Sequence, residues 1–251
     1  MCADAEGQAR SPAGGARSPA ALPLVLVPGL LSSPRLYAEQ LPALWRSGPV
    51  TVADNTRGET VGQMASAILD AAPPRFALAG LSMGGYIALE IMRQASGRVA
   101  KLALLDTSAR PDTPAQRARR QTQIEKTRGG RFAEIPGEQW PLLVRPSALE
   151  SKQLWGIVQL MAEETGPDAF IRQQLAIMSR PDSRPDLAAI SCPSLVLVGE
   201  HDALTPPELA AEMAAGITGA QLVVVPDSGH LSTLEQPDLV TQALGEWLSA
   251  A

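Results

Sequence analysis

Cysteine and histidine are scarce in this chain of 251 residues, which has two of each. Cys2 lies near the start and Cys192 stands just before an apolar run, so no structural disulfide is expected, and the sequence favours a reducing, cytoplasmic location. Two histidines, two distant cysteines and no clustered carboxylates do not make a ligand set, so no metal site is predicted. The sequence also lacks a phosphate-binding loop and a dinucleotide fingerprint, so no cofactor is predicted.

Excess positive charge and long apolar runs are missing too. The net charge of −5 and the pI near 5.2 argue against a general nucleic-acid binder. No apolar stretch approaches the roughly 20 residues that span a bilayer. Residues 1–22, rich in Ala, Gly, Ser, Pro and Arg, lack the apolar centre of a secretory signal and are predicted to be a flexible tail. The 45% of hydrophobic residues suffices for one sizeable core.

Short apolar runs alternate with helical patterns in both halves of the chain. Runs typical of buried strands occur at 24–27, 50–52, 76–79, 101–105, 194–198 and 222–225. Helices are predicted at 36–45, at 60–71, after residue 82, and from about 237 to 248. Thr205, followed by Pro206, Pro207 and Glu208, predicts a further helix with Thr205 as its cap. This alternation predicts an α/β fold with a mostly parallel sheet covered on both faces.

The alternation stops between residues 110 and 186, where only helices are predicted. We therefore expect a core of residues 23–109 and 187–251 with a helical insert of residues 110–186. Two apolar stripes with helical spacing occur in the insert, one formed by Leu154, Ile157, Val158 and Met161 and one by Ile171, Leu175 and Met178. Such stripes pack an insert onto the core at its edge and line a pocket at its centre.

The insert also carries Arg117, Arg119 and Arg120. Their simplest interpretation is a solvated helix face, and the alternative is a group that attracts anionic substrates to the cleft. The predominantly apolar helices around them favour an uncharged, partly hydrophobic substrate.

The segment from Ala79 to Gly85 reads Ala-Gly-Leu-Ser-Met-Gly-Gly and lies between a predicted strand and a predicted helix. Its centre is Gly-x-Ser-x-Gly, which at a strand-to-helix turn is a nucleophile elbow. Glycine is needed on both sides of Ser82 because a nucleophile raised above the end of a sheet leaves no room for neighbouring side chains. We therefore predict that Ser82 is the nucleophile.

A serine nucleophile needs a base, and the chain offers only His201 and His230. His230 follows a strand end and can reach over the sheet, whereas His201 is expected at the pocket edge with its ring turned away. Asp202 is the predicted carboxylate partner of His230, in the order Ser, Asp, His. Asp106 is the rival acid, because it also follows a strand.

Three further predictions complete the site, and two of them concern the substrate. The backbone N–H groups of Met83 and Leu30 are predicted to form the oxyanion hole, with Leu31 as second choice. The side chains of Leu31, Trp140 and Trp155 are predicted to contact the substrate. Asp227, a sequence neighbour of His230, is expected to be structural.

The chain resembles the α/β-hydrolase superfamily from about Leu22 to Leu248, above all small bacterial esterases and enol-lactonases of the 3-oxoadipate type. The segments that resemble it are Leu26–Gly29, Gly80–Gly85, Gly199–Asp202 with Thr205-Pro206, and Ser228–His230. The resemblance implies an α/β-hydrolase fold in which residues 110–186 form a cap over the active site.

Two departures from the family pattern stand out. The loop after the first strand, usually His-Gly, is Pro28-Gly29, which removes a polar group near the site. The short segment before that strand leaves little room for the usual initial hairpin, so six strands are expected rather than eight.

The residues and the resemblance together predict a serine hydrolase that cleaves a small-molecule ester or lactone through an acyl-enzyme. The alternatives are a C–C bond hydrolase or lyase on the same triad, and a ligand-binding protein with negligible turnover. The sequence leaves oligomerisation open.

Overall fold

The computed structural model describes residues 21–250, so most of the predicted tail of residues 1–22 lies outside the described residues. A parallel sheet of six strands, ordered β2-β1-β3-β4-β5-β6, forms the centre. Its strands are β1 (Leu24–Val27), β2 (Val50–Val52), β3 (Phe76–Leu81), β4 (Val99–Leu105), β5 (Ser194–Gly199) and β6 (Gln221–Val225). The prediction of a parallel α/β sheet is confirmed.

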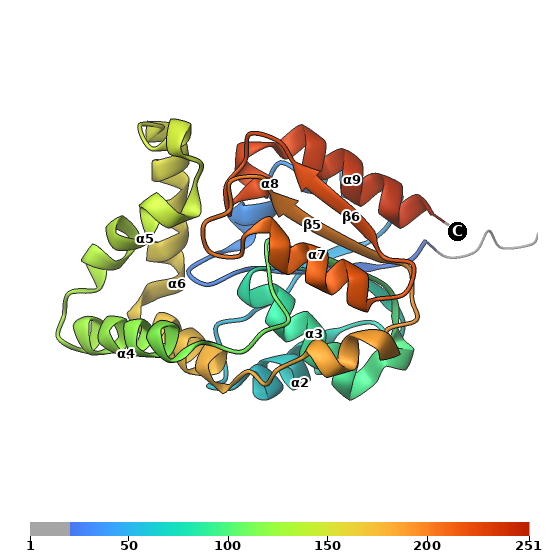
Figure 1. Cartoon of the computed structure of the whole chain (residues 1–251), viewed down its shortest axis with the longest axis horizontal. Coiled ribbons are helices and arrows are strands. Elements are labelled where there is room, and N and C mark those ends of the chain that lie inside the picture. Colours follow the sequence, from blue (N-terminus) through green and yellow to red (C-terminus); the bar gives the residue numbers. More distant parts are fainter. Residues whose placement is uncertain (1–20, 251) are drawn as a thin grey trace, which may run out of the picture.

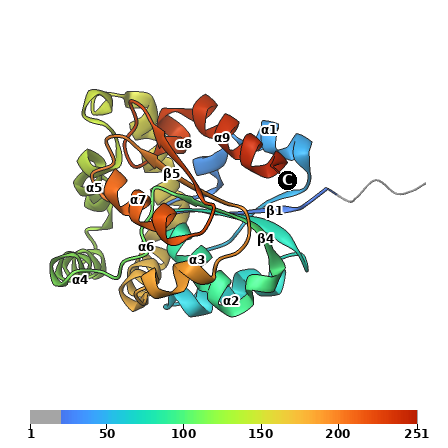
Figure 2. The same ribbon diagram turned by 45° about the vertical axis from the view of Figure 1, so that its right-hand side comes forward.

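Helices cover both faces of the sheet (Figures 1 and 2). One face carries α2 (Val61–Ala71), α3 (Met83–Ala95) and α7 (Pro207–Gly216), and the other carries α1 (Leu41–Leu44), α8 (Ser232–Glu235) and α9 (Pro237–Ser249). Along β1, Val25 and Val27 pack on the first face while Leu24 and Leu26 pack on the second. The strand is buried on both faces, which explains its continuous apolar sequence.

The helix predicted at residues 36–45 is wrong. The segment contains a 3-10 helix at Pro34–Tyr37, the four-residue α1 and another 3-10 helix at Trp45–Ser47. Pro42 lies in the first turn of α1, where its missing N–H costs no hydrogen bond, whereas inside a longer helix its ring would clash with a preceding carbonyl.

Three long segments of helix lie between β4 and β5: α4 (Pro114–Arg128), α5 (Ile135–Leu143) and α6 (Lys152–Ser179), which kinks at Gly166. They gather at one end of the sheet (Figure 1). Val158 and Met161 pack against the core as predicted. In the second half of α6 the buried face contains Gln173 and Ile177 rather than the predicted stripe at residues 171, 175 and 178, which is half-buried. Within residues 21–250, no helix has the length and apolarity to cross a membrane.

Candidate active site

Ser82 occupies a strained turn between β3 and α3. Its φ of 56° and ψ of −117° lie outside the regions that side chains prefer. A Cβ on Gly80 would overlap the backbone of Gly84, and a Cβ on Gly84 would overlap the carbonyl of Val27. Both glycines are therefore needed for close backbone approach, and the strain at Ser82 lifts its hydroxyl beyond the end of the sheet.

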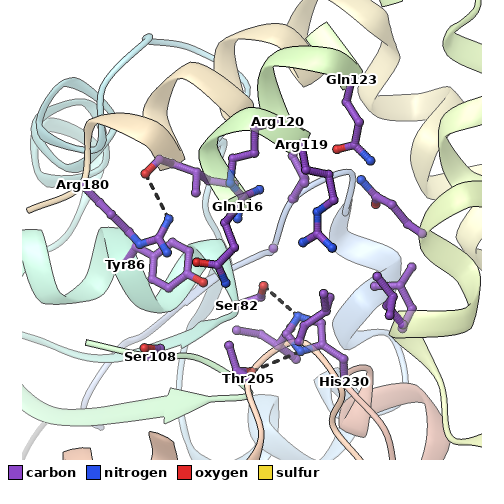
Figure 3. A pocket seen from close by; sticks show the side chains of 18 of the residues that line it. Ser82, Tyr86, Ser108, Gln116, Arg119, Arg120, Gln123, Arg180, Thr205 and His230 are labelled. Atoms are coloured by element: carbon purple, nitrogen blue, oxygen red, sulfur yellow. Dashed lines mark hydrogen bonds between the residues drawn. The ribbon is translucent and has the colours of Figure 1, made fainter. Parts of the chain in front are cut away.

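The structure brings the three predicted residues of the triad together. The Nε2 atom of His230 lies 2.8 Å from the Oγ atom of Ser82. On the other side of the ring, Nδ1 lies 2.8 Å from the Oδ2 atom of Asp202 (Figure 3 shows the contact with Ser82). Asp202 and His230 are 3% and 2% exposed, so the contact between them is shielded from water, whereas Ser82 is half-buried. This arrangement can take a proton from the serine hydroxyl.

Asp202 is held by hydrogen bonds from the loop that follows it. Its Oδ1 atom accepts from the N–H groups of Leu204 and Thr205, at 2.8 and 2.9 Å. The Thr205 hydroxyl donates to Oδ2 at 2.7 Å and lies 3.3 Å from Nδ1 of His230. The prediction that Thr205 caps α7 is therefore wrong: the helix begins after Pro206, and the hydroxyl binds the buried carboxylate instead.

The electrostatics of His230 follow from this partner. Burial alone would lower the pKa of His230, but the negative charge and hydrogen bond of Asp202, together with the charges of Asp106 and Glu235, outweigh it, so the pKa is raised above its ordinary value. The imidazolium formed by proton transfer is thereby stabilised.

The rival acid, Asp106, lies at the end of β4 and is fully buried. Its Oδ1 atom accepts from the N–H of Gly199 at 2.9 Å, and Oδ2 accepts from the Ser232 hydroxyl. Burial and the nearby charge of Asp202 raise its pKa to about 8. Asp106 makes no hydrogen bond to His230 among the described residues; its two hydrogen bonds join β5 to α8.

Two backbone amides beside Ser82 are free to bind an anion. Neither Leu30 N–H nor Met83 N–H donates a hydrogen bond to any residue in the described part of the chain. The N–H of Leu31, the second choice from sequence, donates to the Oε1 atom of Gln173 at 3.0 Å. The first two amides therefore remain available to an acceptor from a bound molecule.

A buried amide network supports the loop that carries Leu30. Gln173, on α6, is 0% exposed, and its Nε2 atom donates to the Oδ1 atom of Asn55 at 3.2 Å. Asn55 in turn donates to the carbonyls of Pro28 and Gly29, at 2.7 and 3.3 Å. The sequence does not reveal this network, because two amides separated by 118 residues give no local signal.

A cavity of about 450 Å³ opens above Ser82. Its walls include His230 and Leu30 from the core and Gln116, Arg119 and Gln123 from α4 (Figure 3). Arg119 and Arg120 also line the cavity. This differs from the solvated helix face that is the simplest interpretation of their sequence.

The three side chains predicted to contact substrate do not line this cavity. Leu31 is 6% exposed and packs with Ile135 and Phe170. Trp140 and Trp155 stack edge to face, with ring centroids 5.4 Å apart, and pack against the core. Both side chains are half-buried, and the apolar surface that they share with each other and with the core is not available to a ligand.

The remaining candidates lie at the periphery. His201 is exposed with its ring 3.8 Å from Glu200, and it does not line the cavity. Asp227 forms an ion pair with Arg145 at 3.1 Å. Glu235, missed from sequence, accepts from the N–H groups of Gly229 and Arg145, at 2.8 and 2.9 Å, and so fixes the loop before His230.

Comparisons with known proteins agree with this geometry. The sequence model of the alpha/beta hydrolase family matches residues 24–243. A pimeloyl-(acyl-carrier protein) methyl ester esterase of Nitrosomonas europaea is 26% identical over 186 residues, which are 72% of this chain and 74% of that protein.

Solved structures give the same result. A thermophilic esterase from Thermogutta terrifontis, solved with malate bound, is similar at a TM-score of 0.83 and 34% identity, over 91% of this chain and 90% of that one. The enol-lactonase of Burkholderia xenovorans LB400 has the same fold, with a TM-score of 0.83 and 24% identity over 94% of each chain. The chain is a member of the alpha/beta hydrolase family.

Proposed function

We propose that this hydrolase cleaves carboxylic esters or lactones through an acyl-enzyme on Ser82. The observation that carries the proposal is the continuous pair of contacts from Ser82 through His230 to Asp202, each 2.8 Å long. Esterases among the similar proteins lend support.

In the first half of the reaction, His230 Nε2 takes the hydroxyl proton of Ser82 while Oγ attacks the carbonyl carbon. The carbonyl oxygen becomes negative and accepts hydrogen bonds from the N–H groups of Leu30 and Met83. When the intermediate collapses, His230 gives its proton to the leaving oxygen, and the acyl group stays on Ser82.

In the second half, water takes the place of the serine hydroxyl. His230 removes a proton from the water as it attacks the acyl carbon, and returns the proton to Oγ as the acid product leaves. A lactone follows the same steps, except that the leaving oxygen belongs to the same molecule as the acid product. Asp202 keeps the ring of His230 oriented throughout.

A series of p-nitrophenyl acyl esters, from acetate to long chains, tests the proposal on wild-type protein and Ser82→Ala together. We expect turnover or a burst of p-nitrophenol that Ser82→Ala abolishes, with a chain-length optimum set by the cavity. If folded wild-type protein releases no p-nitrophenol at any chain length, the general esterase activity is refuted, and lactones and ring-cleavage diketones are the next substrates to assay.

A further inference from the structure

Four arginines line the cavity above Ser82, and carboxylates hold three of them. Arg110 pairs with Glu212 at 2.8 Å. Arg120 and Arg180 share the carboxylate of Asp112, each at 2.8 Å. These three guanidinium groups therefore have their charge balanced within the protein, and the pair of Arg110 with Glu212 also joins the insert to the core.

The fourth, Arg119, differs from the others. Within residues 21–250 its side chain forms no ion pair and no hydrogen bond. It descends from α4, and its guanidinium group points toward the space above Ser82 and His230 (Figure 3). Burial, and after it the charge of Arg120, lowers the pKa of Arg119, but a guanidinium group stays protonated in proteins. An unbalanced positive charge thus faces the reacting groups.

The acidic side chain on the cavity wall does not balance this charge. Glu138 forms an ion pair with Lys126, which does not line the cavity. The carboxylate of Glu138 is therefore paired with a lysine and does not neutralise the guanidinium group of Arg119.

Two amide side chains of α4 add neutral donors beside Arg119. The amide oxygen of Gln116 accepts from the N–H of Thr113 at 2.9 Å, and that of Gln123 accepts from Gln174 at 2.8 Å. Both NH2 groups make no hydrogen bond to the described residues, so donors without acceptors gather on this wall. A planar carboxylate accepts two parallel hydrogen bonds from a guanidinium group, and further ones from amides.

We propose that Arg119 binds a carboxylate of the substrate, so that the preferred substrates are esters or lactones with a second, ionised carboxyl group. The apolar lining residues Leu142, Leu143 and Leu204 suit the hydrocarbon chain that joins the two ends. This proposal replaces the prediction, made from the apolar helices of the insert, that the substrate is uncharged. The hydrolytic part of this inference rests on the proposed function; the binding of a carboxylate does not.

Two p-nitrophenyl esters of equal acyl length test the inference: the valerate, which is neutral, and the glutarate half-ester, which ends in a carboxylate. The measured quantity is the ratio of kcat/KM for the glutarate to that for the valerate. Arg119→Gln is expected to lower this ratio by roughly tenfold to a hundredfold, the usual effect of losing a charge-assisted hydrogen bond. Arg119→Glu is expected to lower it further by repulsion.

Arg117→Gln is the matched control. Arg117 stands on the same helix, donates to the Met178 carbonyl at 2.7 Å and does not line the cavity. We expect it to leave the ratio unchanged. An equal loss in both arginine variants would mean that only the general charge of α4 matters, and an unchanged ratio in Arg119→Gln would overturn the inference.

Binding gives a readout that does not depend on turnover. Monomethyl glutarate is titrated calorimetrically into Ser82→Ala and into Ser82→Ala with Arg119→Gln, with methyl valerate as the neutral probe. We expect the second substitution to weaken glutarate binding at least about tenfold. Arg119-dependent binding without turnover of any ester would refute ester hydrolysis and keep the carboxylate site. Turnover of esters with no effect of Arg119 on binding would refute the carboxylate site alone.

Discussion

The floor and the roof of the cavity differ in how their polar groups are satisfied. On the floor, Ser82 and His230 line the cavity, and Asp202, which contacts His230, accepts four hydrogen bonds within the protein. On the roof, the α4 residues Gln116, Arg119 and Gln123, several donors lack an acceptor among residues 21–250. Groups satisfied internally are held in one geometry, as a reaction requires, whereas free groups are available to a ligand. The difference supports the two proposals together, in which the core supplies the reaction and the insert selects the substrate.

The largest effects should come from the floor. Ser82→Ala and His230→Ala are each expected to reduce kcat by about ten-thousandfold or more, because nucleophile and base act as a unit. The double variant should lose little beyond either single one. Steady-state kinetics on p-nitrophenyl esters, with circular dichroism as a check on folding, measures this. Multiplicative losses in the double variant would contradict a shared role.

Asp202→Asn should reduce kcat by about ten-thousandfold, because an amide does not hold the required tautomer of His230. Asp106→Asn should reduce it by less than about tenfold. With its pKa near 8, Asp106 is mostly neutral at pH 7, and an asparagine can still accept from Gly199 and donate to Ser232. The reverse ranking in a side-by-side assay would make Asp106 the catalytic acid.

Gln173→Leu tests whether the roof also supports the floor. It removes the acceptor of Leu31 N–H and the donor to Asn55, so the loop that carries the Leu30 amide loses its anchor. We expect kcat to fall by roughly tenfold to a hundredfold, somewhat less than the loss of an oxyanion donor itself, with KM changed little.

The control for Gln173→Leu is Gln121→Leu. Gln121 is an exposed residue of α4 that donates a hydrogen bond to Glu125, so we expect its replacement to leave kcat unchanged. A change in KM alone for Gln173→Leu would assign Gln173 to substrate binding rather than to the oxyanion loop.

The pH profile gives a smaller effect. His230 must be neutral to accept the serine proton, so kcat/KM falls as the pH drops through its pKa. Because that pKa is raised above the ordinary 6.5, the acid-side midpoint should lie above pH 6.5. In Asp202→Asn the charge that raises it is gone, and the residual activity should have its midpoint at lower pH. An unshifted midpoint would show that another group titrates.

The smallest effect on activity is expected from the tryptophan pair. Trp140→Phe removes the indole hydrogen bond to the Leu149 carbonyl and part of the contact with Trp155. We expect a loss of about 1 kcal/mol in unfolding free energy and less than about twofold change in kcat/KM. Denaturant unfolding measures the unfolding free energy, and ester kinetics measure kcat/KM. A large rise in KM with unchanged stability would show that Trp140 contacts the substrate, as the sequence predicts.

The strands and the elbow could be predicted because their signals are local. A strand buried on both faces needs a continuous apolar run, and β1 and β5 have one. The glycines around Ser82 are required by backbone contacts within a few residues and with the adjacent strand. The single helix predicted at residues 36–45 is wrong, because Pro42 does not fit inside a longer helix.

The sequence by itself determined the parallel sheet, the position of Ser82 at a strand end and the two further strand ends that bear Asp202 and His230. Parallel strands place their carboxyl ends at one edge, so topology alone brings these residues near one another. Only the tertiary structure decided that Thr205 binds Asp202 rather than capping α7 and that Gln173 accepts from the Leu31 amide. It also decided that, of two arginines in the cavity wall, Arg120 pairs with Asp112 while Arg119 has no partner among residues 21–250. These outcomes depend on which distant groups compete for each donor and acceptor, and that competition is settled only when the insert packs on the core.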